Sequence, residues 1–154
     1  MRRPSELLLL GRMAFFAALV PALLRLKLST LERVLEPTHP RRLPVDVQPH
    51  EAERIAGLVD HTLATGLPVI RSGCLTRGLT LYYFLRRAGV DAVLVFGLGR
   101  VEGEEFAGHC WVVRDGEPLL EKQDPRPLFA ETYRIPSAAR ASRESVAGRT
   151  APTS

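Results

Sequence analysis

Apolar positions divide the chain into three helical stretches followed by shorter runs typical of strands. Residues 5–35 are apolar over most of their length and predict a helix with a kink at Pro21, because proline removes a backbone donor. Residues 49–65 carry apolar side chains at helical spacing and predict a second helix. A third, largely buried helix is predicted over 74–88, and Gly89 is suited to end it in the left-handed conformation.

The apolar runs become short after residue 90. Residues 92–98 and 106–113 predict two strands, joined by a polar turn at 100–105. The Arg-Asp-Gly sequence at 114–116 indicates a hairpin, and 117–121 is predicted to return as a further strand. Helices followed by a small antiparallel sheet predict an α+β fold.

The length of 154 residues favours one domain, which we place at 1–136. Three prolines mark residues 36–48 as a linker after the first helix. Residues 137–154 are rich in Ala, Ser, Arg and Thr without periodicity, so a disordered tail is predicted there.

The chain is ordinary in composition, with 45% hydrophobic and 25% charged residues, and its net charge is +4. Two cysteines provide no disulfide framework, which favours a reducing, cytoplasmic location. Basic residues do not alternate with aromatic ones, so nucleic-acid binding is not expected. Residues 7–26 are apolar enough to suggest a membrane segment, but Arg12 and Pro21 interrupt them. We expect a helix that packs on its own domain or on a partner, with peripheral membrane contact as the alternative.

A cysteine and a histidine stand in contexts that favour nucleophilic catalysis. Cys74 opens the predicted third helix, and His109 lies in a predicted strand. The start of a helix favours the thiolate form of cysteine, and a histidine can accept the thiol proton. The pair therefore predicts a cysteine hydrolase. The structural alternative is a buried helical cysteine and a core histidine, since free cysteine is among the most buried residue types.

A third polar group that orients the imidazole would complete such a site. A three-residue hairpin loop at 114–116 places Glu121 opposite His109, within reach of a hydrogen bond. A two-residue turn would place Lys122 there instead. We predict Glu121 as the third member of the site and Asp124 as the second choice, while a surface charge is the structural alternative for Glu121.

Other residues near the pair are assigned by their position. Cys110 should point to the opposite face of the sheet from His109 and lie in the core. Trp111 shares the face of His109, where it would either shield the site or fill the core. Arg71 and Arg77 flank the thiol; they could favour its thiolate form or contact an acidic part of a substrate, or be structural. No Cys-x-x-Cys or His-x-x-x-His spacing occurs, so no zinc site is expected.

Several segments together resemble a known family. Residues 74–81, Cys-Leu-Thr-Arg-Gly-Leu-Thr-Leu, are similar to the Cys-Leu-x-Arg-x-Leu-x-Leu motif of the lasso-peptide biosynthesis B proteins, which belong to the transglutaminase-like superfamily. Residues 85–90 resemble the helix end that follows in that family, and 96–98 resemble its apolar strand ending in glycine. Gly-His-Cys-Trp-Val-Val at 108–113, followed by Asp-Gly at 115–116, resembles its histidine segment.

The resemblance extends over residues 7–135 and implies a papain-like cysteine peptidase core. It implies that Cys74, His109 and Glu121 are the catalytic set, by the logic of a Cys-His-Asp triad. The family usually has alanine where Cys110 stands and aspartate where Glu121 stands. The backbone N–H of Cys74 is the expected oxyanion donor.

The same resemblance implies a peptidase that removes the leader from a ribosomally made precursor peptide. Residues 1–50 lack the strands of a leader-binding domain, so a split form is expected. Its implied partners are the precursor, a separate leader-recognition protein and an ATP-dependent macrolactam cyclase. No metal or organic cofactor is implied. Two other hypotheses are a transglutaminase-like amidase or peptidase with another substrate, and a non-catalytic interaction subunit that is membrane-associated through residues 7–26.

Overall fold

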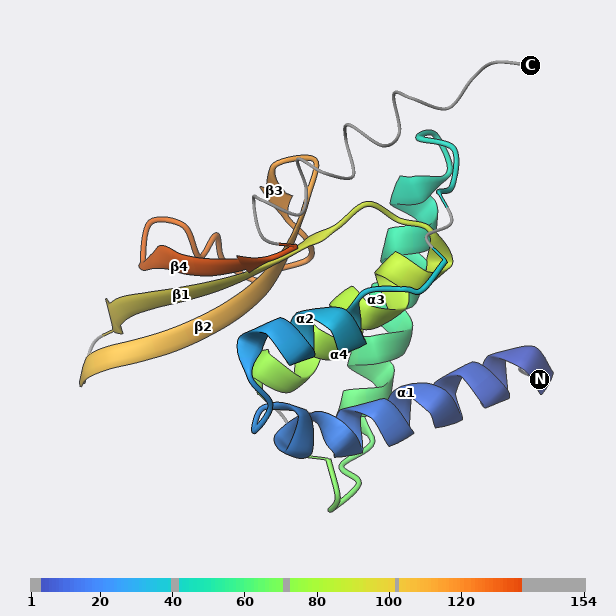
Figure 1. Cartoon of the computed structure of the whole chain (residues 1–154), viewed down its shortest axis with the longest axis horizontal. Coiled ribbons are helices and arrows are strands. Elements are labelled where there is room, and N and C mark those ends of the chain that lie inside the picture. The colour runs from blue at the N-terminus through green and yellow to red at the C-terminus, as the bar shows by residue number, and fades with distance from the viewer. Residues whose placement is uncertain (1–3, 40–41, 71–72, 102, 137–154) are drawn as a thin grey trace.

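The computed structural model describes residues 4–39, 42–70, 73–101 and 103–136. Within these ranges, helices α1 (Pro4–Leu23), α2 (Leu28–Leu35), α3 (Gln48–Ala64) and α4 (Cys74–Ala88) precede strands β1 (Val93–Val101), β2 (Glu104–Arg114), β3 (Glu117–Pro118) and β4 (Phe129–Ile135). The helices gather on one side of the antiparallel sheet (Figure 1). The predicted α+β class is confirmed. The tail predicted at 137–154 lies outside the described residues.

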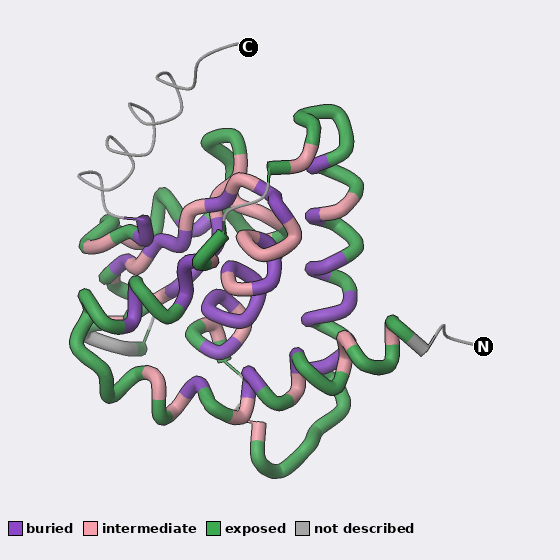
Figure 2. The backbone as a smooth tube through the Cα atoms, turned by 45° about the vertical axis from the view of Figure 1, so that its right-hand side comes forward, coloured by how far each residue is buried: buried purple, intermediate pink, exposed green. Residues whose placement is uncertain are grey.

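The core is built around α4, which contacts α1, α3 and the two central strands (Figure 2). Leu79, Leu81, Tyr82 and Leu85 of this helix are fully buried. Gly89 ends the helix with a φ of 90°, which is a left-handed conformation that glycine adopts without steric cost. The predictions of a buried third helix over 74–88 and of its glycine cap are confirmed.

The first predicted helix consists of two helices. α1 continues through Pro21 to Leu23, and the chain then turns over residues 24–27 before α2 begins at Leu28. The prediction of one helix over 5–35 with a kink at Pro21 was therefore wrong. Pro21 lies in the last turn of α1, where it interrupts only the end of the hydrogen-bond ladder.

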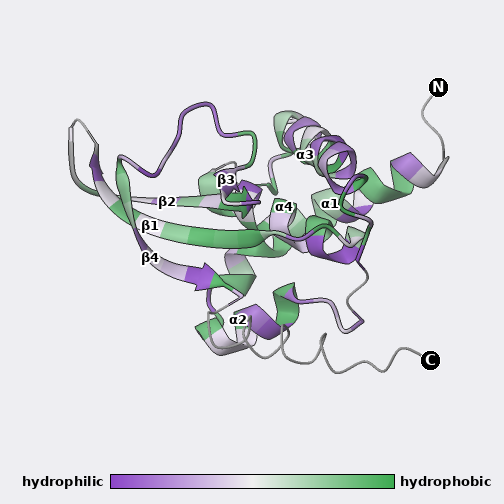
Figure 3. Cartoon of the chain, turned by 90° about the horizontal axis from the view of Figure 1, so that it is seen from above, coloured by the Kyte–Doolittle hydropathy of each residue, from purple (hydrophilic) through white to green (hydrophobic). Residues whose placement is uncertain are grey.

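α1 is apolar around most of its circumference (Figure 3). Met13, Phe16 and Val20 are buried in the core, whereas Leu8 and Phe15 are each 68% exposed. By length and composition, Ser5–Leu23 could cross a membrane, a test that core helices and signal sequences also pass. One face of α1 therefore packs on its own domain, as expected. Contact of the exposed face with a membrane stays a prediction.

The sheet has the strand order β3-β2-β1-β4. β1 and β2 continue into residues 100–105, which were predicted as a turn, and they meet at Gly103 with a φ of 92°. The edge strand β4 was not predicted. Its alternation of Phe129, Tyr133 and Ile135 with polar residues is a strand signal that sequence reasoning overlooked.

The hairpin between β2 and β3 differs from the predicted one. Arg114 pairs with Glu117, so the loop has two residues, Asp115 and Gly116, both with positive φ. This is the geometry of a type I′ turn, which suits Asp-Gly. The predicted three-residue loop was wrong, and β3 stops at Pro118 instead of continuing to residue 121.

Candidate active site

An open cavity of about 770 Å³ lies between α3, the start of α4, β2 and the segment that follows β3. Cys74, His109 and Glu121 all line it, together with Asp60 and Arg77. The fold thus brings together three residues, singled out from the sequence, that are distant along the chain.

Cys74 is the first residue of α4 and is half-buried. Gly73 precedes it in an extended conformation, and the carbonyl of Gly73 accepts the backbone N–H of Arg77 at 3.0 Å. The thiol therefore sits where the unpaired N–H groups of a helix begin. These groups carry partial positive charge, which stabilises an anion such as a thiolate.

The imidazole of His109 is held by aromatic rings. It stacks with Trp111 at a centroid distance of 5.8 Å and with Phe129 of β4 at 5.0 Å. Gly97, the β1 partner of His109, leaves room for this arrangement, because a Cβ there would lie 2.9 Å from the Trp111 ring. Trp111 is buried and is not among the described residues that line the cavity. Trp111 therefore fills the interior beside the imidazole, and shielding of the Cys-His pair from water stays a prediction.

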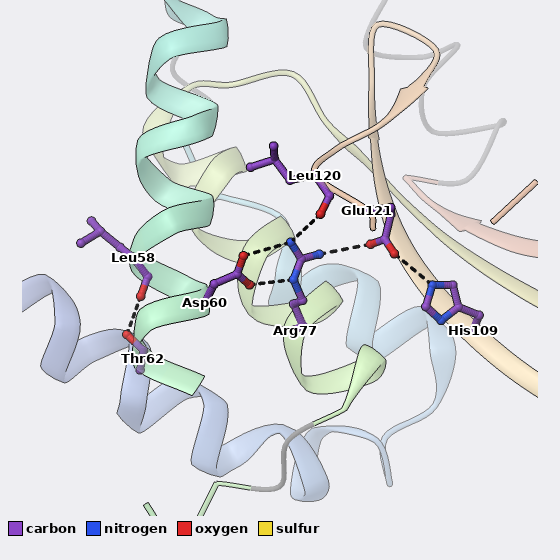
Figure 4. Close-up of polar contacts among 7 residues, drawn as sticks. All are labelled: Leu58, Asp60, Thr62, Arg77, His109, Leu120 and Glu121. Carbon is purple, nitrogen blue, oxygen red and sulfur yellow. Dashed lines mark hydrogen bonds and ion pairs between the residues drawn. The ribbon is translucent and has the colours of Figure 1, made fainter. Parts of the chain in front are cut away.

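His109 contacts Glu121, with 3.2 Å between Nε2 and Oε2 (Figure 4). A regular continuation of the observed hairpin would have brought Lys122 opposite His109 instead. The ladder is still regular at Leu119, whose N–H bonds to the carbonyl of Val112 at 2.8 Å. Leu120 then adopts a left-handed φ of 50°, which breaks the strand alternation. The predicted contact is present, but an irregular residue and not the predicted register produces it.

This contact has a consequence for the imidazole. When Nε2 donates its hydrogen to the Glu121 carboxylate, Nδ1 of the neutral ring carries no hydrogen and can accept a proton. The second-choice residue, Asp124, also lines the cavity, but its carboxylate binds the Arg126 guanidinium at 2.7 Å. That hydrogen bond holds the pKa of Asp124 below its usual range. Glu121, and not Asp124, is the partner of His109.

Arg77 is engaged inside the protein. Its guanidinium contacts Asp60 of α3 at 2.7 Å, Glu121 at 3.1 Å and the Leu120 carbonyl at 3.2 Å (Figure 4). Burial lowers the pKa of Arg77, but Asp60 and Glu121 outweigh it, so the pKa is raised. These contacts agree with the structural alternative for Arg77, and its contact with an acidic part of a substrate stays a prediction. Arg71 lies outside the described residues.

A family model described as the transglutaminase-like superfamily matches residues 16–134, most of the described chain. The chain belongs to the transglutaminase-like superfamily. This superfamily includes cysteine peptidases and transglutaminases. The matched range runs from α1 to β4 and includes every residue that lines the cavity described above. Neither the curated proteins nor the solved structures contain a match to the chain.

The second cysteine of this transglutaminase-like chain differs sharply from the first. Cys110 is 2% exposed and packs against α4, with its side chain in the core as predicted. Burial raises the pKa of its thiol well above the ordinary range, and the charges of Cys74 and Glu121 act in the same direction. Cys74 is therefore the thiol suited to act as a nucleophile.

A smaller cavity, of about 470 Å³, adjoins Cys74 on the side of α1. The end of that helix and the turn after it contribute Val20, Pro21, Leu24 and Arg25. No sequence pattern indicated that the end of α1 lies beside Cys74 or that Asp60 contacts Arg77, because both depend on how the helices pack.

Proposed function

We propose that this protein is a cysteine peptidase that removes the leader from a precursor peptide during lasso-peptide biosynthesis. One observation carries the proposal: Cys74 at a helix start and His109, already bound to Glu121, line the same cavity. Membership of a superfamily that includes cysteine peptidases supports the chemistry. The resemblance of residues 74–81 and 108–113 to the lasso-peptide B proteins supports the substrate.

In the proposed acylation step, Nδ1 of His109 accepts the proton of the Cys74 thiol. The thiolate attacks the scissile carbonyl and forms a carbon–sulfur bond. The backbone N–H of Cys74 donates to the resulting oxyanion. When the carbon–nitrogen bond breaks, His109 returns its proton to the leaving amine, and a thioester remains. Glu121 keeps the ring in the required tautomer and stabilises the imidazolium.

In the proposed deacylation step, His109 accepts a proton from water while the water oxygen attacks the thioester carbonyl. The carbon–sulfur bond then breaks, the sulfur regains its proton, and a carboxylic acid leaves. The cavity is open to solvent and, at about 770 Å³, falls within the range of small-ligand sites, so several residues of an extended peptide fit beside the thiol.

The proposal includes the partners and the location implied by the resemblance. These are the precursor peptide, a separate leader-recognition protein and an ATP-dependent macrolactam cyclase, all in the cytoplasm. The exposed side of α1, with Leu8 and Phe15 beside an apolar groove of about 490 Å³, supports docking of the recognition protein. If the recognition protein co-purifies with wild type but not with Phe15→Asp, the result would support docking on this side of α1. Sedimentation with anionic vesicles would instead indicate membrane contact.

The first test is the rate of alkylation by iodoacetamide as a function of pH, mapped to each cysteine. We expect Cys74 to react fast below pH 7, where an ordinary thiol with a pKa of about 8.5 is slow. His109→Ala should abolish this reactivity. Cys110 serves as an internal control, because it is buried and should stay unmodified in the folded protein. An ordinary or unreactive Cys74 would favour a non-catalytic interaction subunit.

The second test is cleavage of a precursor by the protein together with its recognition partner, followed by mass spectrometry. We expect release of the leader by wild type and none by Cys74→Ala. A reactive Cys74 with no cleavage of any neighbouring precursor would indicate an amidase or peptidase with another substrate. Genes for a cyclase, a leader-binding protein and a short precursor beside this one would support the lasso-peptide assignment.

A further inference from the structure

Asp60 contacts Arg77, and Arg77 contacts the Glu121 carboxylate that faces His109 (Figure 4). We infer that Asp60 and Arg77 form a positioning unit that keeps the Glu121 carboxylate in contact with His109. The inference rests on the proposed function, since it assigns them to the same reaction. They are positioning residues, because they act on the imidazole through Glu121.

The two oxygens of the Glu121 carboxylate have different partners. Oε1 accepts from Nη1 of Arg77 at 3.1 Å, and Oε2 faces Nε2 of His109 at 3.2 Å. The arginine therefore fixes the rotation of the carboxylate that presents Oε2 to the ring. The Glu121 side chain is only 14% exposed, so protein groups surround most of the carboxylate.

The sheet itself does little to hold this glutamate. β3 is two residues long, and Leu120 departs from the strand with a left-handed φ of 50°. Arg77 holds this segment in place of strand hydrogen bonds. Its Nη2 donates to the Leu120 carbonyl at 3.2 Å, and its Nη1 donates to the Glu121 side chain. One guanidinium thus fixes the backbone and the carboxylate of this turn.

Asp60 fixes the guanidinium in turn. Its two oxygens lie 2.7 Å from Nε and 3.3 Å from Nη2 of Arg77, which is a two-point contact with the fork of the arginine. Since Asp60 belongs to α3 and Arg77 to α4, the contact sets the plane of the guanidinium from a separate helix. Lysine cannot reproduce this geometry, because an ammonium is a point charge.

The test uses the variants Arg77→Gln, Arg77→Lys and Asp60→Asn. The matched control is Arg54→Gln, which breaks an exposed ion pair with Glu51 within α3. The first readout is the nitrogen NMR spectrum of the neutral His109 ring, which reports the hydrogen on Nε2 or Nδ1. The second is the iodoacetamide rate of Cys74 at pH 6.5.

We expect wild type and Arg54→Gln to hold the hydrogen on Nε2, and Arg77→Gln to give a mixture of tautomers. The Cys74 rate should fall about tenfold in Arg77→Gln, which is the effect of one lost hydrogen bond to a charged group. Asp60→Asn should have a smaller effect, and the double variant should react no more slowly than Arg77→Gln, because Asp60 acts through Arg77. Arg77→Lys should recover part of the rate.

A folded Arg77→Gln protein with the wild-type tautomer and rate would overturn the inference. If Arg77→Gln does not fold, the half-exposed Asp60 carries the same test, and a wild-type tautomer in Asp60→Asn would then overturn it. A change of tautomer in a protein that cleaves no precursor would refute the proposed function and leave the positioning role standing. A loss of stability alone, as from a merely structural contact, would not move the tautomer.

Discussion

Gly78 of α4 lies directly against Cys110 of β2, so that a Cβ at position 78 would be 2.6 Å from the cysteine Sγ. Gly78 is one helical turn after Cys74, and Cys110 is next to His109 in the strand. The absence of a side chain at this glycine therefore sets how closely the two elements that carry the thiol and the imidazole approach each other.

We expect Gly78→Ala to lower the free energy of unfolding by about 1–3 kcal/mol, the usual cost of an overpacked core. The added methyl would push α4 away from β2, so the alkylation rate of Cys74 should fall as well. Urea unfolding and iodoacetamide kinetics measure the two effects. The double variant Gly78→Ala with Cys110→Ala should recover most of both, because it removes the sulfur atom that the methyl strikes.

The control for this prediction is Gly57→Ala, in the interior of α3. A Cβ at position 57 meets nothing within 4 Å, so only the helix propensity changes. Alanine should therefore stabilise the protein by about 0.5–1 kcal/mol. If both alanine variants were equally stable, the close contact of Gly78 with Cys110 would not determine the stability of the protein.

The buried thiol of Cys110 should make stability depend on alkaline pH. Burial raises the pKa of Cys110, so the folded protein keeps this proton while the unfolded chain releases it above about pH 8.5. The buried, protonated thiol therefore contributes fully to the free energy of unfolding below about pH 8.5, and this contribution is lost as the pH rises above that value. Between pH 9 and 10, wild type should lose about 1.2 kcal/mol more than Cys110→Ala. Urea unfolding of both proteins at pH 7, 9 and 10 checks this, and parallel pH curves would contradict it.

Trp111 is the only tryptophan of the chain and stacks with His109 at 5.8 Å. The emission maximum of an indole shifts to longer wavelength when water reaches its ring. We therefore expect His109→Ala, which removes the imidazole stacked on the buried Trp111, to shift tryptophan emission to longer wavelength. His61→Ala on α3 should leave the emission spectrum unchanged. An unchanged spectrum in His109→Ala would contradict the stacking of the two rings.

Neighbouring phenylalanines of α1 provide a test of how this helix packs. Phe16 is 7% exposed and stacks on Tyr83 at 4.1 Å, whereas Phe15 is 68% exposed. Phe16→Ala should lower the free energy of unfolding by about 3–5 kcal/mol. Phe15→Ala should change it by about 0.5 kcal/mol or less. Thermal unfolding of the two variants distinguishes them, and equal losses would mean that the outer face of α1 is also buried.

Local signals predicted the parts of the site that depend on local structure. Cys74 begins a helix whose apolar pattern and glycine end are visible in the sequence, and His109 lies in a clear strand. The contact of Glu121 with His109 is present, although the hairpin register from which it was predicted is not. The position of Glu121 depends on the left-handed φ of Leu120, which leucine rarely adopts and which no sequence pattern announces.

The remaining differences arise from packing between distant elements. Asp60 reaches Arg77 only because α3 and α4 lie side by side, and a charged residue on a helix carries no mark of such a partner. The sequence predicted a kink at Pro21, because proline is the usual signal for one, but the helix tolerates Pro21 in its last turn and ends at Leu23. The edge strand β4 did have a signal in its alternating aromatic residues.

The last turn of α1 supplies Pro21 and, just beyond it, Leu24 and Arg25, which line a cavity together with Cys74. An apolar helix near the N-terminus is a segment that a protein chemist would first consider deleting to improve expression. Deletion here would remove core side chains such as Met13 and one wall beside the thiol. A shortened protein that failed to react would then report a damaged fold and not the absence of a nucleophile. Expression designs should keep α1 and substitute polar residues on its exposed side instead.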